Sequence, residues 1–193
     1  MNRNFFEVLY AGTEDPWELE TSDYEARKYA LTLAALPRHR YRSGFEPGCS
    51  VGVLTARLAE RCEHLEAWEP IERPRLRCRE RVSAAGLTER VTVTGEELDP
   101  DAAFPAADLI VLSEVLYYLP EKKLGPTLQR LFAAAQPGAD IVAVHWRSRD
   151  EGMEMTGDEA HAELRDPRHG LQLLGGWREE EYVIDVFRLP ERT

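Results

Sequence analysis

The sequence is poor in the features that mark membrane, secreted and metal-binding proteins. No stretch of its 193 residues approaches the roughly 20 consecutive apolar residues that a membrane-spanning helix needs. The N-terminal segment is acidic and lacks the basic and apolar regions of a signal peptide. The three cysteines form no CxxC pair and the five histidines form no HExxH motif. We therefore expect a cytoplasmic protein without membrane association, disulfide framework or structural metal.

An excess of positive charge is also absent. The chain carries 35 acidic and 24 basic residues, which gives a net charge of −11. A surface this acidic repels phosphate backbones, so we expect no nucleic-acid partner. Residues 72–81, ERPRLRCRER, are a local exception with arginines at every second position. On a helix this spacing spreads the arginines over opposite sides, which favours a solvated helix over a phosphate-binding face.

The chain does have an alternation of strand-like and helix-like runs. Strands are predicted at 43–46, 65–68, 91–94, 108–112 and 141–146, and helices at 17–36, 51–62, 73–85 and around 124–132. A short helix capped by Thr156 and Glu159 precedes two further strand-like runs, 171–174 and 182–189, which should form an antiparallel hairpin. The pattern predicts one α/β domain with a Rossmann-like, doubly wound, mostly parallel seven-stranded sheet. Residues 1–42 would form an N-terminal helical lid over the core at 43–193.

A glycine turn after the first strand is the most informative motif. Glu46, Gly48 and Gly52 form an E-x-G-x-x-x-G pattern, and Glu69 ends the second strand. Such a turn presents backbone N–H groups at a helix N-terminus, and a carboxylate about 20 residues on suits a ribose diol. The motif therefore predicts a nucleoside cofactor. Because the G-x-G-x-x-G of dinucleotide sites is absent, a nicotinamide oxidoreductase is disfavoured.

The same motif resembles motif I of class I S-adenosylmethionine-dependent methyltransferases, although that family more often has Asp where this chain has Glu69. The segment 112–119, LSEVLYYL, is similar to the family's segment along cofactor and substrate. A narrower resemblance to the NodS-type N-methyltransferases rests on Trp17 and on phrases at 21–28, 45–50, 112–118, 144–147 and 156–161. In that family the acceptor is the free amine of a de-N-acetylated amino sugar in a chitooligosaccharide.

The resemblance implies S-adenosyl-L-methionine as cofactor and indicates which residues hold it. Glu46 would reach the cofactor ammonium, Glu69 the ribose hydroxyls, Arg27 the carboxylate, and Glu96 or Glu97 the adenine amino group. The complete set of expected cofactor-binding residues is Trp17, Tyr24, Arg27, Glu46, Gly48, Cys49, Gly52, Glu69, Pro70, Glu96, Glu97, Ser113, Glu114 and Tyr117.

The acceptor side is expected at the ends of the fourth and fifth strands. Glu114 and His145 are the candidate catalytic residues, because either could hold the acceptor amine or accept its proton. The expected substrate contacts are Tyr117, His145, Asp158 and His161. The sequence thus predicts methyl transfer to the amine of a small molecule by a monomer or homodimer. Two alternatives stay open: O-methylation of a small molecule, or a cofactor-binding regulatory protein without turnover.

Overall fold

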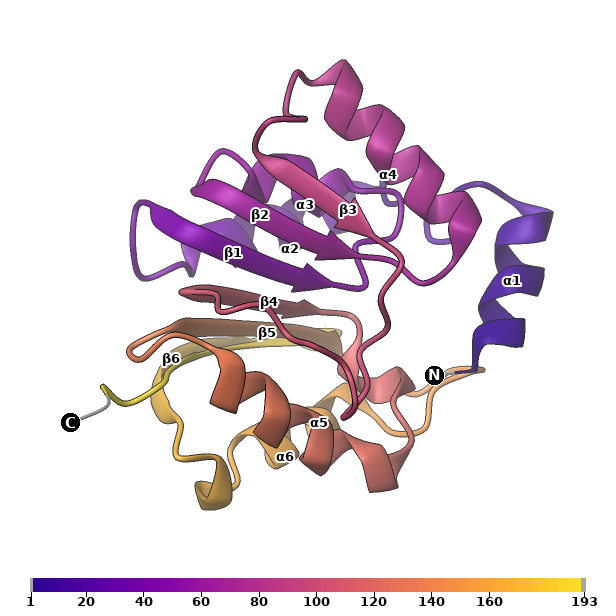
Figure 1. Ribbon diagram of the computed structural model, residues 1–193. Coiled ribbons are helices and arrows are strands. Elements are labelled where there is room, and N and C mark those ends of the chain that lie inside the picture. The colour runs from indigo at the N-terminus through magenta and orange to yellow at the C-terminus, as the bar shows by residue number, and fades with distance from the viewer. Residues whose placement is uncertain (1, 192–193) are drawn as a thin grey trace.

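A seven-stranded sheet forms the centre of the computed structural model, which describes residues 2–191 (Figure 1). The strand order is β3-β2-β1-β4-β5-β7-β6. The strands are β1 (Tyr41–Pro47), β2 (Cys62–Trp68), β3 (Val91–Thr94), β4 (Leu109–Ser113), β5 (Asp140–Trp146), β6 (Gln172–Arg178) and β7 (Tyr182–Arg188). Strands β1 to β5 pair in parallel, whereas β7 pairs antiparallel with both β5 and β6. The predicted Rossmann-like sheet with a terminal hairpin is confirmed.

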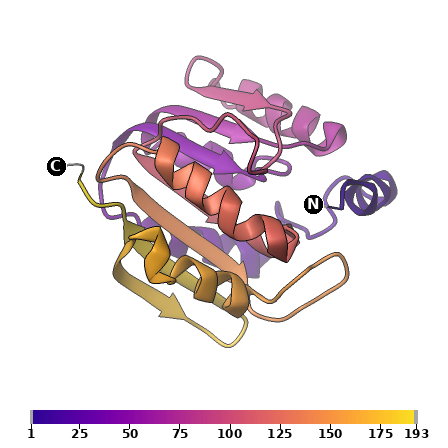
Figure 2. The same ribbon diagram turned by 60° about the horizontal axis from the view of Figure 1, so that its bottom comes forward.

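Helices cover both faces of the sheet. They are α1 (Arg3–Gly12), α2 (Asp23–Ala34), α3 (Val53–Leu58), α4 (Glu72–Ala84), α5 (Glu121–Ala134) and α6 (Gly157–Leu164), with 3-10 turns η1 (Leu116–Tyr118) and η2 (Pro167–His169). Residues of α2, α3 and α4 pack in one core cluster, and those of α5 and α6 pack in the other (Figure 2). Along β4, Leu109 and Val111 enter the first cluster, whereas Ile110 and Leu112 enter the second. This alternation explains why β4 is apolar throughout.

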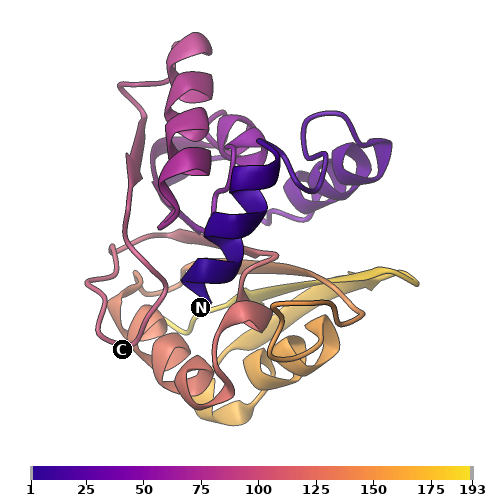
Figure 3. The ribbon, with the colours of Figure 1, turned by 90° about the vertical axis from the view of Figure 1, so that its right-hand side faces the viewer.

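Helix α1 was not predicted, and it stands at the carboxyl ends of the parallel strands (Figure 3). Its side chain Arg3 donates to the Pro70 carbonyl (2.7 Å), and Arg73 of α4 donates to the Tyr10 carbonyl (2.6 Å). The Phe6 ring meets the Tyr118 ring edge-on at 4.8 Å. Helix α1 is therefore fastened to both halves of the sheet.

Two predicted helix boundaries need correction. The helix expected at 17–36 begins only at Asp23, because Ser22 caps it and accepts from the Glu25 N–H (3.4 Å). The Glu25 carboxylate does not return to the cap but binds Lys28, so half of that capping box is missing. The helix expected at 51–62 is limited to Val53–Leu58, and Cys62 already opens β2.

The arginines of α4 lie less freely in solvent than predicted. Arg75 donates to the Glu69 carbonyl (2.8 Å), Arg79 to the Val93 carbonyl (2.7 Å), and Arg81 to the Val51 carbonyl (2.9 Å). Arg77 instead pairs with Glu80 of the same helix, at 3.1 Å. Arg75, Arg79 and Arg81 thus tie α4 to β3 and to the loops that follow β1 and β2, and those loops form one side of the site described next.

Candidate functional site

A cavity of about 370 Å³ opens at the carboxyl ends of the parallel strands. It lies where β1 and β4 are neighbours and the strand order reverses, the usual ligand position in a doubly wound sheet. Helices α1 and α2 supply its outer wall. Most predicted cofactor residues line it: Trp17, Tyr24, Glu46, Gly48, Cys49, Glu69, Pro70, Glu96, Glu97, Ser113, Glu114 and Tyr117.

The glycine turn is tied to the end of β2. The N–H groups of Gly48 and Cys49 both donate to the Trp68 carbonyl, at 2.8 and 3.0 Å. Gly48 has φ +78°, and a Cβ there would lie 3.0 Å from the Val115 side chain. Ser50 also has a positive φ, +49°. The turn therefore presents bare backbone to the cavity at Gly48, which a larger residue would obstruct.

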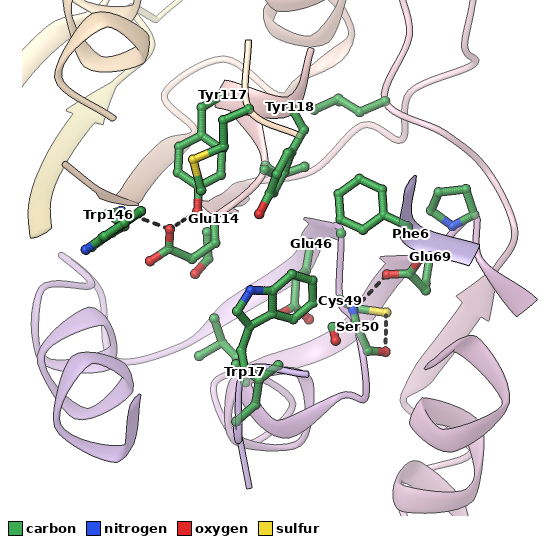
Figure 4. Close-up of a pocket in the computed structure, with 18 of the residues that line it drawn as sticks. Phe6, Trp17, Glu46, Cys49, Ser50, Glu69, Glu114, Tyr117, Tyr118 and Trp146 are labelled. Carbon is green, nitrogen blue, oxygen red and sulfur yellow. Dashed lines mark hydrogen bonds between the residues drawn. The ribbon is translucent and has the colours of Figure 1, made fainter. Parts of the chain in front are cut away.

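Glu69 holds the same turn through its carboxylate. Its Oε2 accepts from the Ser50 N–H at 3.0 Å (Figure 4). Its Oε1 accepts from the Ile71 N–H at 2.9 Å. Burial raises the pKa of Glu69 to about 7, although these two N–H groups favour the charged form. Each carboxylate oxygen has two lone pairs, so both can accept a further hydrogen bond from a ligand hydroxyl.

Glu46 is the group in the cavity that most clearly requires a ligand. Its side chain is buried, and its Oε2 has no hydrogen-bond partner among the described residues. Burial raises the pKa of Glu46 to about 8. A buried carboxylate oxygen is normally hydrogen-bonded, and a ligand ammonium would supply the missing donor. Together, Glu46, Glu69 and the bare turn fit the amino acid and ribose parts of S-adenosylmethionine.

A second cluster surrounds Glu114, which follows β4 with φ +53°. Its Oε1 accepts from Lys28 Nζ (2.6 Å), and its Oε2 accepts from the Trp146 N–H (2.9 Å) and the Tyr117 hydroxyl. Lys28 also donates to Glu25 (2.8 Å). Burial disfavours the charged lysine, but the two carboxylates outweigh it and raise the pKa of Lys28. Lys28 therefore stays protonated.

The Glu114 cluster and the Glu69 turn lie at opposite sides of the cavity, with Glu46 and Trp17 between them (Figure 4). Two ligands, one held at each side, would therefore come together in the middle of the cavity, near Glu46. This arrangement suits a cofactor at the Glu69 side and a second molecule at the Glu114 side.

Comparison with known proteins identifies the family. The family model of nodulation protein S (NodS) matches residues 7–163. Nodulation protein S of Bradyrhizobium diazoefficiens is 32% identical over 156 residues, which are 78% of this chain and 70% of the relative. The chain belongs to the NodS family. Nodulation protein S of Rhizobium tropici is 27% identical over 187 residues, 92% of this chain and 76% of the relative.

A solved NodS structure shows the same fold. It is the crystal structure of N-methyltransferase NodS from Bradyrhizobium japonicum WM9 in complex with S-adenosyl-L-homocysteine. It superposes with a TM-score of 0.83 at 21% identity, covering 99% of this chain and 100% of that one. Family membership places the protein among the S-adenosylmethionine-dependent N-methyltransferases.

Three residues predicted for the site in this NodS-family protein do not line the cavity. Arg27 is exposed and donates to both carboxylate oxygens of Glu179, each at 2.6 Å. Gly52 has φ +81° and backs onto Cys78 of α4. Asp158 is paired with Arg147 and Arg178, each at 3.0 Å. Helix geometry explains the first correction: one residue on, the α2 side chain turns by about 100° and Lys28 enters the cavity instead.

The two predicted histidines also lie outside the cavity lining. His145 and His161 are fully buried, and His145 Nδ1 lies 3.0 Å from His161 Nε2. The direct substrate contact expected of them is therefore wrong, because both rings face protein on every side. The next residue along, Trp146, reaches the cavity and binds Glu114 through its backbone N–H.

Sequence reasoning missed Lys28, Glu25, Tyr10, Ser50 and Trp146. Tyr10 comes from the unpredicted α1, and its hydroxyl lies 2.6 Å from Ser50 Oγ. A signal for Lys28 was available: Glu25 and Lys28 stand three residues apart, the spacing of a helical ion pair. Within residues 2–191 there is no helix long and apolar enough to cross a membrane and no group of three metal-binding side chains.

Proposed function

We propose that this protein transfers the methyl group of S-adenosylmethionine to the amine of a small molecule, in the cavity under α1 and α2. The charge of the lining residues carries the acceptor assignment. The acids among them are Glu25, Glu46, Glu69, Glu96, Glu97, Glu114 and Asp150. Lys28 is the single Lys or Arg among the residues that line the cavity. A lining with this excess of carboxyl groups favours an ammonium over a neutral hydroxyl, because an ammonium can donate to a carboxyl and keep it charged.

The Glu69 side would hold the cofactor. Glu69 would accept hydrogen bonds from the ribose hydroxyls, and Glu46 would accept one from the ammonium of the methionine part. When bound, S-adenosylmethionine supplies a methyl group that its sulfonium has already activated. The main tasks of the protein are then to orient the two ligands and to exclude water. Orientation alone can lower the activation barrier by several kcal/mol.

The Glu114 side would hold the acceptor. An ammonium donating to Glu114 would replace part of its contact with Lys28, and Glu25 Oε2, which has no hydrogen-bond partner among the described residues, offers a second acceptor nearby. The amine must lose a proton before it attacks, and a carboxylate in hydrogen-bond contact can take it. The Tyr117 hydroxyl and the Trp146 N–H would keep Glu114 oriented meanwhile.

The acceptor class we propose is a deacetylated amino sugar or a related biosynthetic intermediate. Membership of the NodS family supports this choice, together with the acidic lining and the rings of Tyr24, Trp146 and Tyr117 in the cavity wall. Aromatic faces attract ammonium groups, including methylated ones. An amino sugar would present one ammonium on a ring of hydroxyls to this wall.

Binding and turnover test the proposal separately. S-adenosylhomocysteine should raise the melting temperature, because a ligand that binds only the native state at about 100 times its Kd adds about 2.7 kcal/mol. NADH should give no shift. Methyl transfer is then followed by mass spectrometry with glucosamine and with chitooligosaccharides deacetylated at one end, each beside its N-acetylated counterpart. Methylation of the acetylated sugars, or of a hydroxyl in either series, would overturn the amine assignment.

A further inference from the structure

Behind the wall that carries Glu114 lies a chain of buried polar side chains that the proposed reaction does not use. It runs from His145 of β5 through His161 of α6 to Asp185 of β7, and these side chains are 0%, 0% and 2% exposed. His145 Nδ1 lies 3.0 Å from His161 Nε2, and His161 Nδ1 lies 2.7 Å from Asp185 Oδ2. Arg165 closes the chain with a 2.7 Å bond to Asp185 Oδ1.

The first link of the chain determines where its protons lie. His145 Nε2 faces the backbone N–H groups of Leu116 (3.1 Å) and Val115 (3.4 Å), which can only donate. His145 Nε2 is therefore an acceptor, and the neutral ring carries its proton on Nδ1. That proton points at His161 Nε2, so His161 in turn carries its proton on Nδ1 and donates it to Asp185. Burial lowers the pKa of His145 far below its usual value, and the neighbouring His161 and Lys28 act in the same direction.

The His145 end of this chain of side chains reaches the residues that touch the cavity. Val115 and Leu116 open η1, whose Tyr117 donates to the Glu114 carboxylate. Glu114 itself adopts φ +53°, which a glutamate rarely does without support from its surroundings. The end of β5 supplies that support twice: the His145 ring binds the turn, and the Trp146 N–H binds the carboxylate.

We infer that His145, His161 and Asp185 are positioning residues that hold η1, and through it the Glu114 carboxylate and the Tyr117 hydroxyl, in place at the acceptor side of the cavity. The inference rests on the proposed role of Glu114 in binding the acceptor. None of the three lines the cavity, so they act through the turn and not on the ligands. This positioning requires the tautomers given above, because a proton on His145 Nε2 would face two N–H groups and could not bind them.

Two substitutions of His145 separate positioning from simple packing. In His145→Gln the side-chain carbonyl can still accept from the η1 N–H groups while the amide donates to His161. In His145→Leu a side chain of similar size offers neither. We expect amide hydrogen exchange at residues 115–118 to rise about tenfold or more in His145→Leu and to stay near wild type in His145→Gln. The kcat/KM for glucosamine methylation should fall by about 100-fold in His145→Leu and be largely retained in His145→Gln, with S-adenosylhomocysteine affinity little changed in both.

Long-range ¹H–¹⁵N spectra of the wild-type imidazoles provide the deciding measurement, because they report the tautomer without any acceptor. Protons on Nδ1 of both His145 and His161 support the inference. A proton on His145 Nε2, a charged His145 ring, or equal exchange rates in the two variants would overturn it. If the wild-type protein methylates no amine, the proposed function fails. The spectra and the exchange rates still decide whether His145, His161 and Asp185 hold η1 in place.

Discussion

The two sides of the cavity are built in different ways. The Glu69 side comes from one continuous βαβ unit, in which the Gly48 N–H donates to the Trp68 carbonyl and the Ser50 N–H donates to the Glu69 carboxylate. The Glu114 side is assembled from α2, the end of β4 and the end of β5, which are distant in sequence. A continuous unit can be predicted from spacing, because its geometry is local. An assembled site depends on which helix face turns inward, and spacing alone does not determine that.

The sharpest test of this difference is Glu114→Gln. The amide keeps the size of the side chain but can neither neutralise an ammonium nor accept its proton, so we expect amine methylation to fall by about 10²- to 10⁴-fold. Affinity for S-adenosylhomocysteine, measured by calorimetry, should stay within a few-fold of wild type. Glu89→Gln, an exposed change on the far side of the same domain, serves as control. Turnover close to wild type in Glu114→Gln would remove this residue from the acceptor side.

Neighbouring residues of α2 allow a matched comparison of stability. Lys28→Met leaves two carboxylates, Glu25 and Glu114, without the buried cation between them, and breaking such a pair typically costs about 3–5 kcal/mol. Arg27→Met removes an exposed partner of Glu179 and should change the free energy of unfolding much less. Denaturant unfolding of both variants measures the difference. Equal losses would contradict the assignment of Lys28 as the inward-facing cation.

Two glycines with the same backbone conformation test the bare turn. Gly48→Ala and Gly86→Ala both force alanine into a left-handed φ, at +78° and +68°, which costs about 1–2 kcal/mol of stability. Only at Gly48 does the new Cβ meet a neighbour, at 3.0 Å, and only Gly48 lines the cavity. We expect S-adenosylhomocysteine affinity to fall about tenfold or more in Gly48→Ala and to remain unchanged in Gly86→Ala. A similar loss in both would show that the effect is global.

The smallest expected effect is a pH dependence of cofactor affinity. Burial raises the pKa of Glu46 to about 8 and that of Glu69 to about 7. Between the ordinary value of 4.5 and these raised values, each carboxyl in the native state holds a proton that the unfolded chain has already released. The native state then binds more protons, and its stability without ligand falls as pH rises from 4.5, the ordinary value, towards 8. Because an ammonium needs the charged form of Glu46, affinity should rise by up to about tenfold per pH unit below 8.

Calorimetry with S-adenosylhomocysteine between about pH 6 and about pH 8 measures this dependence. Glu46→Gln should bind more weakly and lose the part of the slope that lies above pH 7, where Glu69 is already charged. An affinity in wild type that does not change with pH would mean that Glu46 is charged before the ligand arrives.

The sheet, its hairpin and the Glu69 side of the cavity could be predicted because they follow from local patterns. Thr156 and Glu159 form the complete capping box expected of them. The similar pattern at Ser22 and Glu25 does not form a complete capping box, because the Glu25 carboxylate binds Lys28 at the cavity wall instead. Both patterns look alike in sequence, and the tertiary neighbour decides between them.

His145 shows the same limit at a strand end. Its position predicted a side chain near the acceptor, and the strand does end there. Side chains alternate across a strand, however, and the ring turns towards α6 while the following residue faces the cavity. The predicted residue, His145 or Arg27, points away from the cavity, and the residue that follows it, Trp146 or Lys28, lines the cavity instead. Helix α1 was missed for another reason, since its contacts are to chain segments much further on.

Helix α1 implies an order in which parts of the domain assemble. It precedes the sheet in the chain, yet its anchors follow 67 and 63 residues later, at the Pro70 carbonyl and the Arg73 side chain. Contacts over such distances form only after the intervening β1 and β2 have paired. Helix α1 therefore docks only after β1 and β2 have paired, and the cofactor cavity gains this part of its outer wall after that step.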